Sequence, residues 1–120
     1  MAIYSTVTLT FLVANDSDKR GVKVNVSDTD TDDTTYSEVS SNRIDIASGA
    51  TDEALSFSGV SSAKLFYLKS SEDITIKLNG SSDALSIRKD LPVFLPATVT
   101  ACTVTNSSGS TANIDYGVVG

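Results

Sequence analysis

The sequence predicts an all-β protein, a single-domain antiparallel β-sandwich or jelly-roll-like fold of about eight or nine strands over residues 1–120. Three observations lead to this prediction. Apolar residues recur with period two in nearly every segment, which is typical of half-buried strands. Turn residues such as Asn, Asp, Ser and Gly interrupt these segments at intervals of about 8–12 residues, and no segment of useful length has the helical period. The length of 120 residues suits one domain whose core needs neither disulfides nor metal.

The first half of the chain contains four predicted strands. In Ile3–Val13 the odd positions are mostly apolar and alternate with threonines. A turn at residues 15–21 precedes a second strand at residues 22–26, and residues 27–35 are predicted to form a polar loop. Two short strands are expected around residues 44–46 and 55–57, each closed by a Ser-Gly turn.

The second half begins with a continuous apolar run at residues 63–69, which is predicted to be a central strand. Alternating runs at residues 74–78 and 85–87 flank Asn79 and Gly80. Asn-Gly is the strongest short hairpin signal because both residues tolerate a positive φ. Since the polar stretch continues to Asp83, a longer loop fits as well as a two-residue turn. Further strands are expected at residues 98–106 and 112–119, separated by a Ser/Gly loop.

The charge of the chain excludes two classes of partner. It carries nine Lys and Arg against fifteen Asp and Glu, for a net charge of −6. Binding to nucleic acid needs a dense basic surface, and adhesion to anionic membranes needs basic residues too, so neither partner is expected. The acidity favours solubility at high copy number. Cys102 is the sole cysteine and the N-terminal segment has no signal-peptide pattern, so we expect synthesis and folding in a reducing cytoplasm.

The residue types argue against catalysis. There is no histidine, which removes the common nucleophilic triads and most zinc sites. Cys102 lies between Ala101 and Thr103 in a predicted strand and has no basic neighbour, so it is expected to be a small buried hydrophobe. The acidic residues fall mainly in predicted turns, and there is no Trp to stack on a sugar. Neither an enzyme activity nor a cofactor is therefore expected, and no catalytic residue is assigned.

One acidic cluster offers a candidate metal site. Asp28, Asp30 and Asp32 have the D-x-D-x-D spacing that opens an EF-hand loop, and calcium prefers several carboxylate oxygens from a flexible loop. The pattern then departs from an EF-hand, because Asp33 stands where Gly is required and Val39 where Glu is required. The alternative reading is a solvated acidic loop.

Three segments are candidates for contact with other proteins. Pro92 and Pro96 exclude residues 91–97 from a central strand, so the apolar residues between them lie on an edge or in a loop. They either plug the end of the sandwich or contact another subunit. The N-terminal strand and the C-terminal segment could also add to the sheet edge of a neighbour. The predicted contact residues are Leu91, Val93, Phe94, Leu95, Tyr116, Val118 and Val119.

The order of elements in residues 64–120 resembles a known class of proteins. An apolar strand (KLFYLKSSEDI) leads to a TIKLNG turn, a short strand, the apolar segment LPVFLP and the ending VTACTVTNSSGSTANIDYGVVG. This resembles small structural proteins of tailed-bacteriophage virions, including capsid decoration or cement proteins and related head or tail accessory proteins. The likeness covers about the C-terminal half of the chain, and its markers, KLNG and NSSGSTA, are turn signatures.

The resemblance implies a non-enzymatic, multi-copy protein of the virion that is made in the host bacterial cytoplasm. Its partners would be the major capsid protein or other virion proteins, and a homo-oligomer is expected. Two alternatives remain open. One is a tail or neck accessory subunit, such as an adaptor or tail-tip protein. The other is a calcium-dependent carbohydrate- or receptor-binding module that uses the acidic cluster.

Overall fold

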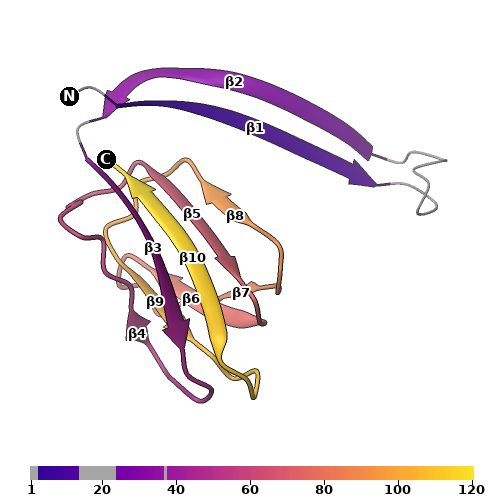
Figure 1. Cartoon of the computed structure of the whole chain (residues 1–120), viewed down its shortest axis with the longest axis vertical. Coiled ribbons are helices and arrows are strands. Elements are labelled where there is room, and N and C mark those ends of the chain that lie inside the picture. The colour runs from indigo at the N-terminus through magenta and orange to yellow at the C-terminus, as the bar shows by residue number, and fades with distance from the viewer. Residues whose placement is uncertain (1–2, 14–23, 37) are drawn as a thin grey trace. The chain divides into compact units, whose positions relative to one another are not determined.

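The computed structural model describes residues 3–13, 24–36 and 38–120, with side chains described for residues 36 and 38–120 (Figure 1). All regular secondary structure in these residues is β-strand, so the all-β prediction is confirmed. The chain divides into two compact units, Met1–Tyr36 and Ser37–Gly120. The sandwich is formed by the second unit. The prediction of a single domain over residues 1–120 stays a prediction.

The first unit is an antiparallel hairpin. Strand β1 (Ile3–Val13) pairs with β2 (Val24–Tyr36), in a register that places Val13 opposite Val24 and Ser5 opposite Asp32. The first strand was predicted with the same bounds. The polar loop predicted at residues 27–35 is wrong, because these residues lie in β2. Asp has a low strand propensity, but the energetic effect of this propensity is small. Pairing of β2 with β1 along its length outweighs it. The turn predicted at residues 15–21 lies outside the described residues.

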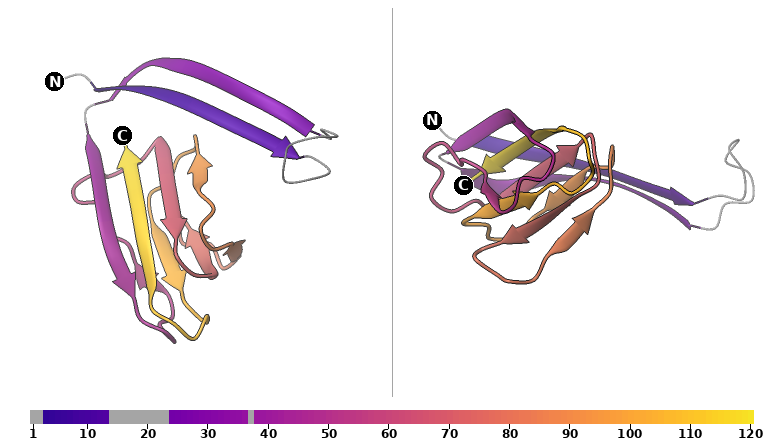
Figure 2. Two further views of the ribbon diagram at one scale, coloured as in Figure 1. Left: turned by 45° about the vertical axis from the view of Figure 1, so that its right-hand side comes forward. Right: turned by 90° about the horizontal axis from the view of Figure 1, so that it is seen from below.

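The second unit contains two four-stranded antiparallel sheets that face each other (Figure 2). The first sheet, called the β5–β10 sheet, has the order β3-β10-β5-β8. Its strands are β3 (Val39–Ile46), β10 (Ala112–Val119), β5 (Leu65–Ser70) and β8 (Val93–Leu95). The second, called the β6–β9 sheet, has the order β4-β9-β6-β7. Its strands are β4 (Glu53–Ala54), β9 (Cys102–Thr105), β6 (Ile74–Leu78) and β7 (Leu85–Ile87).

This arrangement confirms the antiparallel sandwich. The described residues form ten strands where about eight or nine were expected. The additional strand is β8, whose residues were predicted to lie on an edge or in a loop. The apolar run at residues 63–69 is confirmed as a central strand, since β5 lies between β10 and β8. A strand was expected at residues 55–57, but the strand in this region is β4 at residues 53–54. Leu55 and Phe57 follow it and are buried.

The core is built by the period-two pattern. Along β10 the even positions from Ala112 to Val118 are buried, and the odd positions between them are not. Phe66 and Leu68 of β5 and Ile76 of β6 are fully buried against them. Burying one such side chain contributes about 1.5–3 kcal/mol, so the facing inner surfaces of the two sheets hold this unit together.

The hairpin between β6 and β7 has the longer of the two loops considered. Strand pairing ends at Ile76 and Leu85, and within the loop Asn79 and Gly80 have φ values of 56° and 71°. The Ser81 N–H donates to the Leu78 carbonyl at 2.9 Å, which closes a tight turn with two positive φ angles. The Asn79 side chain accepts from the Thr100 N–H at 2.7 Å and donates to the Thr98 carbonyl at 3.0 Å. This side chain therefore joins the turn to the segment that enters β9.

A buried amide connects the two sheets near their ends. Asn106 follows β9 and is fully buried, and its Nδ2 donates to the Ile46 carbonyl at 2.9 Å and the Ser110 carbonyl at 2.8 Å. Its Oδ1 accepts from the N–H of Ser108 at 3.1 Å and from the hydroxyl of Ser108 at 2.7 Å. The amide thus holds the end of β3 and the Ser/Gly loop before β10 at the end of β9, and all of its hydrogen-bonding atoms are satisfied.

Candidate protein-contact surface

The outer face of the β5–β10 sheet carries two adjacent rows of side chains, and each row contains apolar residues. Register places Val119 opposite both Val39 and Leu65, and it places Tyr67 opposite both Gly117 and Phe94. Since the alternate residues Phe66, Tyr116 and Val118 are buried in the core, these positions face outward. We call Val39, Leu65, Tyr67, Phe94 and Val119 the apolar surface.

The two rings of this surface are exposed to a similar degree. Tyr67 is 39% exposed and Phe94 is 38% exposed, and Val39 is more exposed than either. Aromatic side chains bury a large area when a partner covers them, and they are enriched where proteins contact one another. An exposed aromatic pair on a rigid sheet is therefore a candidate contact with another protein.

Gly117 places no side chain on the outer face opposite Tyr67. It occupies the middle of β10 between Ser41 and Tyr67 and does not have a positive φ. Among the described residues, a Cβ atom built there would meet the Ser40 carbonyl oxygen at 3.6 Å, an ordinary contact. Neither backbone conformation nor packing requires glycine at this position, and glycine within a strand often marks close approach of another molecule. Gly117 therefore leaves space beside the exposed Tyr67 ring.

Charged residues border the apolar surface on the same face. Asp115 lies opposite both Arg43 and Lys69, and the Arg43 Nε is 3.7 Å from the Asp115 Oδ1. Both side chains of this pair are largely exposed, so the pair adds little to stability. An apolar centre with a charged border is the usual anatomy of a protein interface.

Some residues of the predicted contact segment 91–97 plug the end of the sandwich, and others are exposed and available for contact. Strand β8 lies at the edge of its sheet, as expected of a segment between Pro92 and Pro96. Val93 and Leu95 are partly buried and pack against the core, so they act as the plug. Phe94 faces outward and Leu91 is 55% exposed, so these two remain accessible to a partner.

The C-terminal contact residues need correction. Tyr116 and Val118 are buried in the core, and the Tyr116 hydroxyl donates to the Ser56 carbonyl at 2.6 Å. Strand β10 is paired on both sides, with β3 and with β5, so it has no free edge to offer a neighbour. Val119 is half-buried on the outer face and belongs to the apolar surface. Sequence reasoning missed Tyr67 as a candidate contact residue, although its position between apolar neighbours in a predicted central strand was a usable signal.

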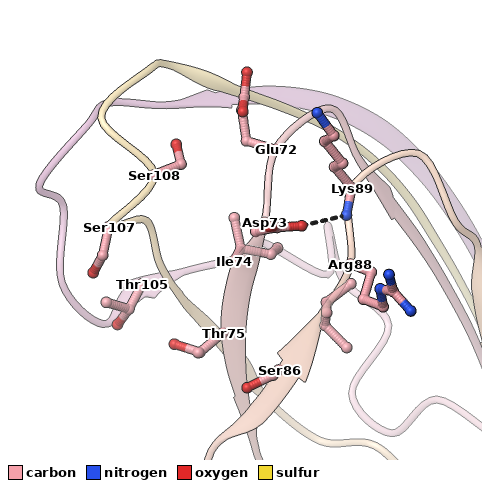
Figure 3. Close-up of a pocket in the computed structure, with 11 residues that line it drawn as sticks. Glu72, Asp73, Ile74, Thr75, Ser86, Arg88, Lys89, Thr105, Ser107 and Ser108 are labelled. Atoms are coloured by element: carbon pink, nitrogen blue, oxygen red, sulfur yellow. Dashed lines mark hydrogen bonds between the residues drawn. The ribbon is translucent and has the colours of Figure 1, made fainter.

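The outer face of the β6–β9 sheet has a different character. Thr75 lies opposite both Thr105 and Ser86, which makes a row of hydroxyl groups across three strands. An open depression of about 530 Å³ lies over this row, bordered by the 107–108 loop and the chain at residues 86–89 (Figure 3). The Asp73 Oδ1 accepts from the Lys89 N–H at 2.8 Å at its rim. This depression is open, and its lining mixes hydroxyl and charged side chains with the apolar Ile74 and Ile87.

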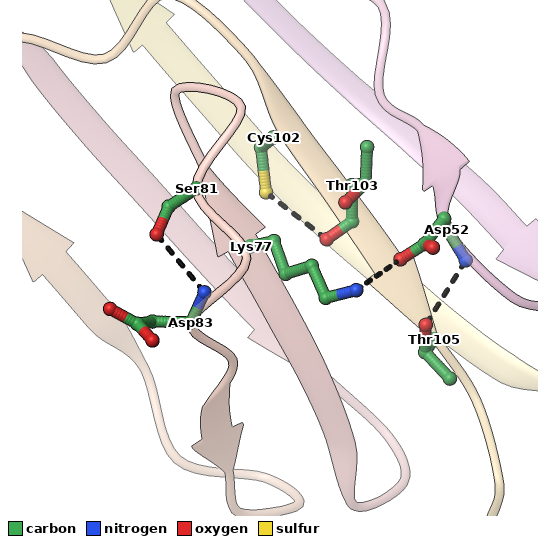
Figure 4. A network of polar contacts seen from close by, with 7 residues as sticks. All are labelled: Asp52, Lys77, Ser81, Asp83, Cys102, Thr103 and Thr105. Atoms are coloured by element: carbon green, nitrogen blue, oxygen red, sulfur yellow. Dashed lines mark hydrogen bonds and ion pairs between the residues drawn. The ribbon is translucent and has the colours of Figure 1, made fainter.

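The same face continues into a small polar network. The Nζ of Lys77 on β6 lies 3.2 Å from the Asp52 Oδ1, and the Asp52 N–H donates to the Thr105 hydroxyl at 3.0 Å (Figure 4). These polar groups lie at the surface and are one another's partners. The two outer faces of the sandwich differ in that the apolar surface lies on the β5–β10 sheet, whereas the side chains named on the β6–β9 sheet are hydroxyl and charged groups.

Cys102 is a buried hydrophobe, as predicted. It is 1% exposed, and burial raises the pKa of its thiol to about 12. The thiol therefore stays protonated at neutral pH. A protonated, inaccessible thiol cannot act as a nucleophile.

The candidate calcium ligands lie in a strand. Asp28, Asp30 and Asp32 occupy alternate positions of β2, and Asp28 and Asp30 lie opposite Leu9 and Val7. The premise of a flexible loop is therefore wrong, and the calcium site itself stays a prediction. Within residues 36 and 38–120, whose side chains the structure describes, no group of three His, Cys, Asp or Glu could hold a metal ion. The described part of the chain also has no helix that could cross a membrane.

Comparisons with known proteins leave the family open. No protein-family model and no curated protein matches the chain. Among solved structures, the Cnp3 cupin domain of Schizosaccharomyces pombe is similar in backbone course, with 8% sequence identity and a TM-score of 0.49. The alignment covers 93% of this chain and 83% of that domain. A likeness at this level does not assign a function or a family.

Proposed function

We propose that this chain is a non-enzymatic structural protein of a tailed-bacteriophage virion, present in many copies, that binds and stabilises the capsid lattice. One structural observation carries the proposal, namely the exposed apolar surface on the outer face of the β5–β10 sheet. The resemblance of residues 64–120 to decoration and related virion proteins supplies the partner. The contact would be made with the major capsid protein.

The physical case depends on the difference between the two outer faces. Covering exposed apolar groups on a sheet with a partner lowers the free energy, whereas the hydroxyl row around Thr75 can form hydrogen bonds with water. A small contact of this kind is weak for a single copy. On a lattice, neighbouring copies and neighbouring sites can combine many weak contacts into stable attachment.

The decisive experiment removes the exposed rings and leaves the core intact. The variant combines Tyr67→Thr with Phe94→Thr, because both residues lie in strands and Thr suits a strand. Val93 and Leu95 stay unchanged, since they pack against the core. The assay is co-sedimentation of the purified protein with phage capsids that lack it.

We expect attachment to fall by at least about tenfold, because two aromatic anchors at an interface are each commonly worth more than 1 kcal/mol. The control is Leu85→Thr, which removes a 48% exposed apolar side chain from the edge strand of the other sheet, where Leu85 lies opposite the buried Ile76. The control should bind as the unmodified protein does. Normal attachment of the folded Tyr67/Phe94 variant would disprove this contact.

A tail or neck accessory subunit would use the same kind of surface, and its copy number separates it from a decoration protein. Decoration requires on the order of hundreds of copies per particle, whereas a ring requires about six to twelve. Quantitative mass spectrometry of purified particles measures this number. A calcium-dependent binding module is tested by thermal unfolding with and without calcium, since a ligand that binds the folded state must raise its stability.

A further inference from the structure

The four outer edges of the two sheets differ in how they are protected. Strands β4 and β7 have two and three residues, and β8 has three residues between two prolines. Short strands and prolines are the usual ways to prevent an edge from pairing with another chain. Strand β3, in contrast, has eight residues with neither proline nor glycine, and β10 is its only strand partner among the described residues.

The hydrogen-bond pattern shows which backbone groups of β3 are available. Glu38 and Gly120 exchange both of their N–H to carbonyl hydrogen bonds at 2.9 Å. In an antiparallel pair such mutual bonds recur at every second residue, so the even positions of β3 are bonded to β10. The N–H and carbonyl groups of the odd positions therefore point away from β10. These odd positions are Val39, Ser41, Arg43 and Asp45, and all four side chains are exposed.

The charges at the odd positions favour one register for a second copy. Two free β3 edges can meet antiparallel about a two-fold axis, with odd positions opposite odd positions. An axis through Arg43 or Asp45 would place like charges directly opposite each other, which is unfavourable. An axis through Ile44 places each Arg43 opposite the Asp45 of the second copy. It also brings the two half-buried Ile44 side chains together on the core side.

We propose that β3 is a dimerisation edge, through which two copies of this chain pair antiparallel about a two-fold axis at Ile44. The product is a continuous sheet that joins the β5–β10 sheets of both copies. The paired segment is short, so the dimer forms reversibly and at moderate to high protein concentration. This inference does not depend on the proposed capsid contact, because it uses the edge of the sheet and is measured on the purified protein alone.

The test is a charge swap followed by sedimentation equilibrium. Arg43→Asp and Asp45→Arg each turn both attractive cross-strand pairs of the dimer into repulsive ones, so each single variant should weaken dimerisation by roughly tenfold or more. The double variant restores opposite charges in both pairs and should dimerise within about threefold of the unmodified protein. The control Lys69→Asp changes a charge on the same face away from the edge and should leave dimerisation unchanged.

A second variant blocks the backbone directly. Ser41→Pro removes an N–H that points away from β10, so it spares the sheet's internal bonds. In the proposed register Ser41 lies opposite Ala47 at the end of the paired segment, so this variant should fold and dimerise more weakly. If this variant fails to fold, the three charge variants of Arg43 and Asp45 test the inference without it. An unmodified protein that stays monomeric up to about 0.5 mM overturns the inference. A dimer that persists in both single charge variants, or that the double variant does not restore, overturns it as well.

Discussion

Tyr67 on β5 lies directly opposite Phe94 on β8, and both rings stand on the outer face of the sheet, each more than a third exposed. Next to Tyr67 in the same strand, Phe66 is fully buried and its ring centre is 6.3 Å from that of Phe57. Adjacent aromatic residues of one strand therefore have different surroundings. This contrast allows the contribution of the exposed rings to folding to be measured.

We expect Phe94→Thr to lower the free energy of unfolding by no more than about 1 kcal/mol, because a cross-strand surface pair contributes roughly 0.2–1 kcal/mol. Phe66→Ala should lower it by about 3–5 kcal/mol, since it leaves a cavity in the core. Urea denaturation measures both values. Equal losses in the two variants would mean that Phe94 serves the fold, and the interpretation of the exposed rings as a docking surface would fail.

Asn106 should be essential for stability because its amide satisfies four hydrogen bonds in a fully buried position. Asn106→Ala leaves the Ile46 and Ser110 carbonyls without this donor, and we expect a loss of about 2–4 kcal/mol in the free energy of unfolding. Asn106→Asp should be at least as damaging, since it removes both N–H donors and places an acid in a buried position. Ser107→Ala, next in the chain and exposed, is the control and should have little effect.

Asn79 contributes to stability both through its positive φ and through its side-chain hydrogen bonds, and two variants separate these contributions. Asn79→Gly keeps the positive φ of 56° accessible but removes the hydrogen bonds to the segment at Thr98 and Thr100. Asn79→Ala removes the bonds and adds backbone strain as well, so it should be less stable than Asn79→Gly by about 1 kcal/mol. Thermal unfolding ranks the three proteins. If Asn79→Ala were as stable as Asn79→Gly, the turn would not hold the positive φ in solution.

Cys102 should make the protein less stable in alkali. Burial raises the pKa of the thiol from 9.0 to about 12, so the folded state keeps a proton that the unfolded state loses above pH 9. The contribution of this group is complete below pH 9 and is lost as the pH rises from 9 toward 12. The free energy of unfolding should thus fall over this range, and Cys102→Ala should show a shallower fall. The same slope in both proteins would contradict this assignment.

Period two in the sequence determined the all-β class and several elements directly. The strand predicted at residues 112–119 has the bounds of β10, and the Asn79-Gly80 turn and the burial of Cys102 follow from local signals alone. These features depend on backbone preferences and on the alternation of apolar and polar residues within a few positions. Local sequence carries that information, although it left the length of the loop around Asn79 and Gly80 open.

The tertiary structure decided which strands are neighbours and which faces are covered. Alternation shows that the two faces of β10 differ, but only its position between β3 and β5 buries Tyr116 and Val118 and leaves the edge of β3 free. Pairing with β1 makes residues 27–35 a strand, although their composition favours a loop. The fully bonded position of Asn106 likewise needs carbonyls from two distant segments. Contacts between residues far apart in the chain fix these features, and a pattern of period two does not specify which strands become neighbours.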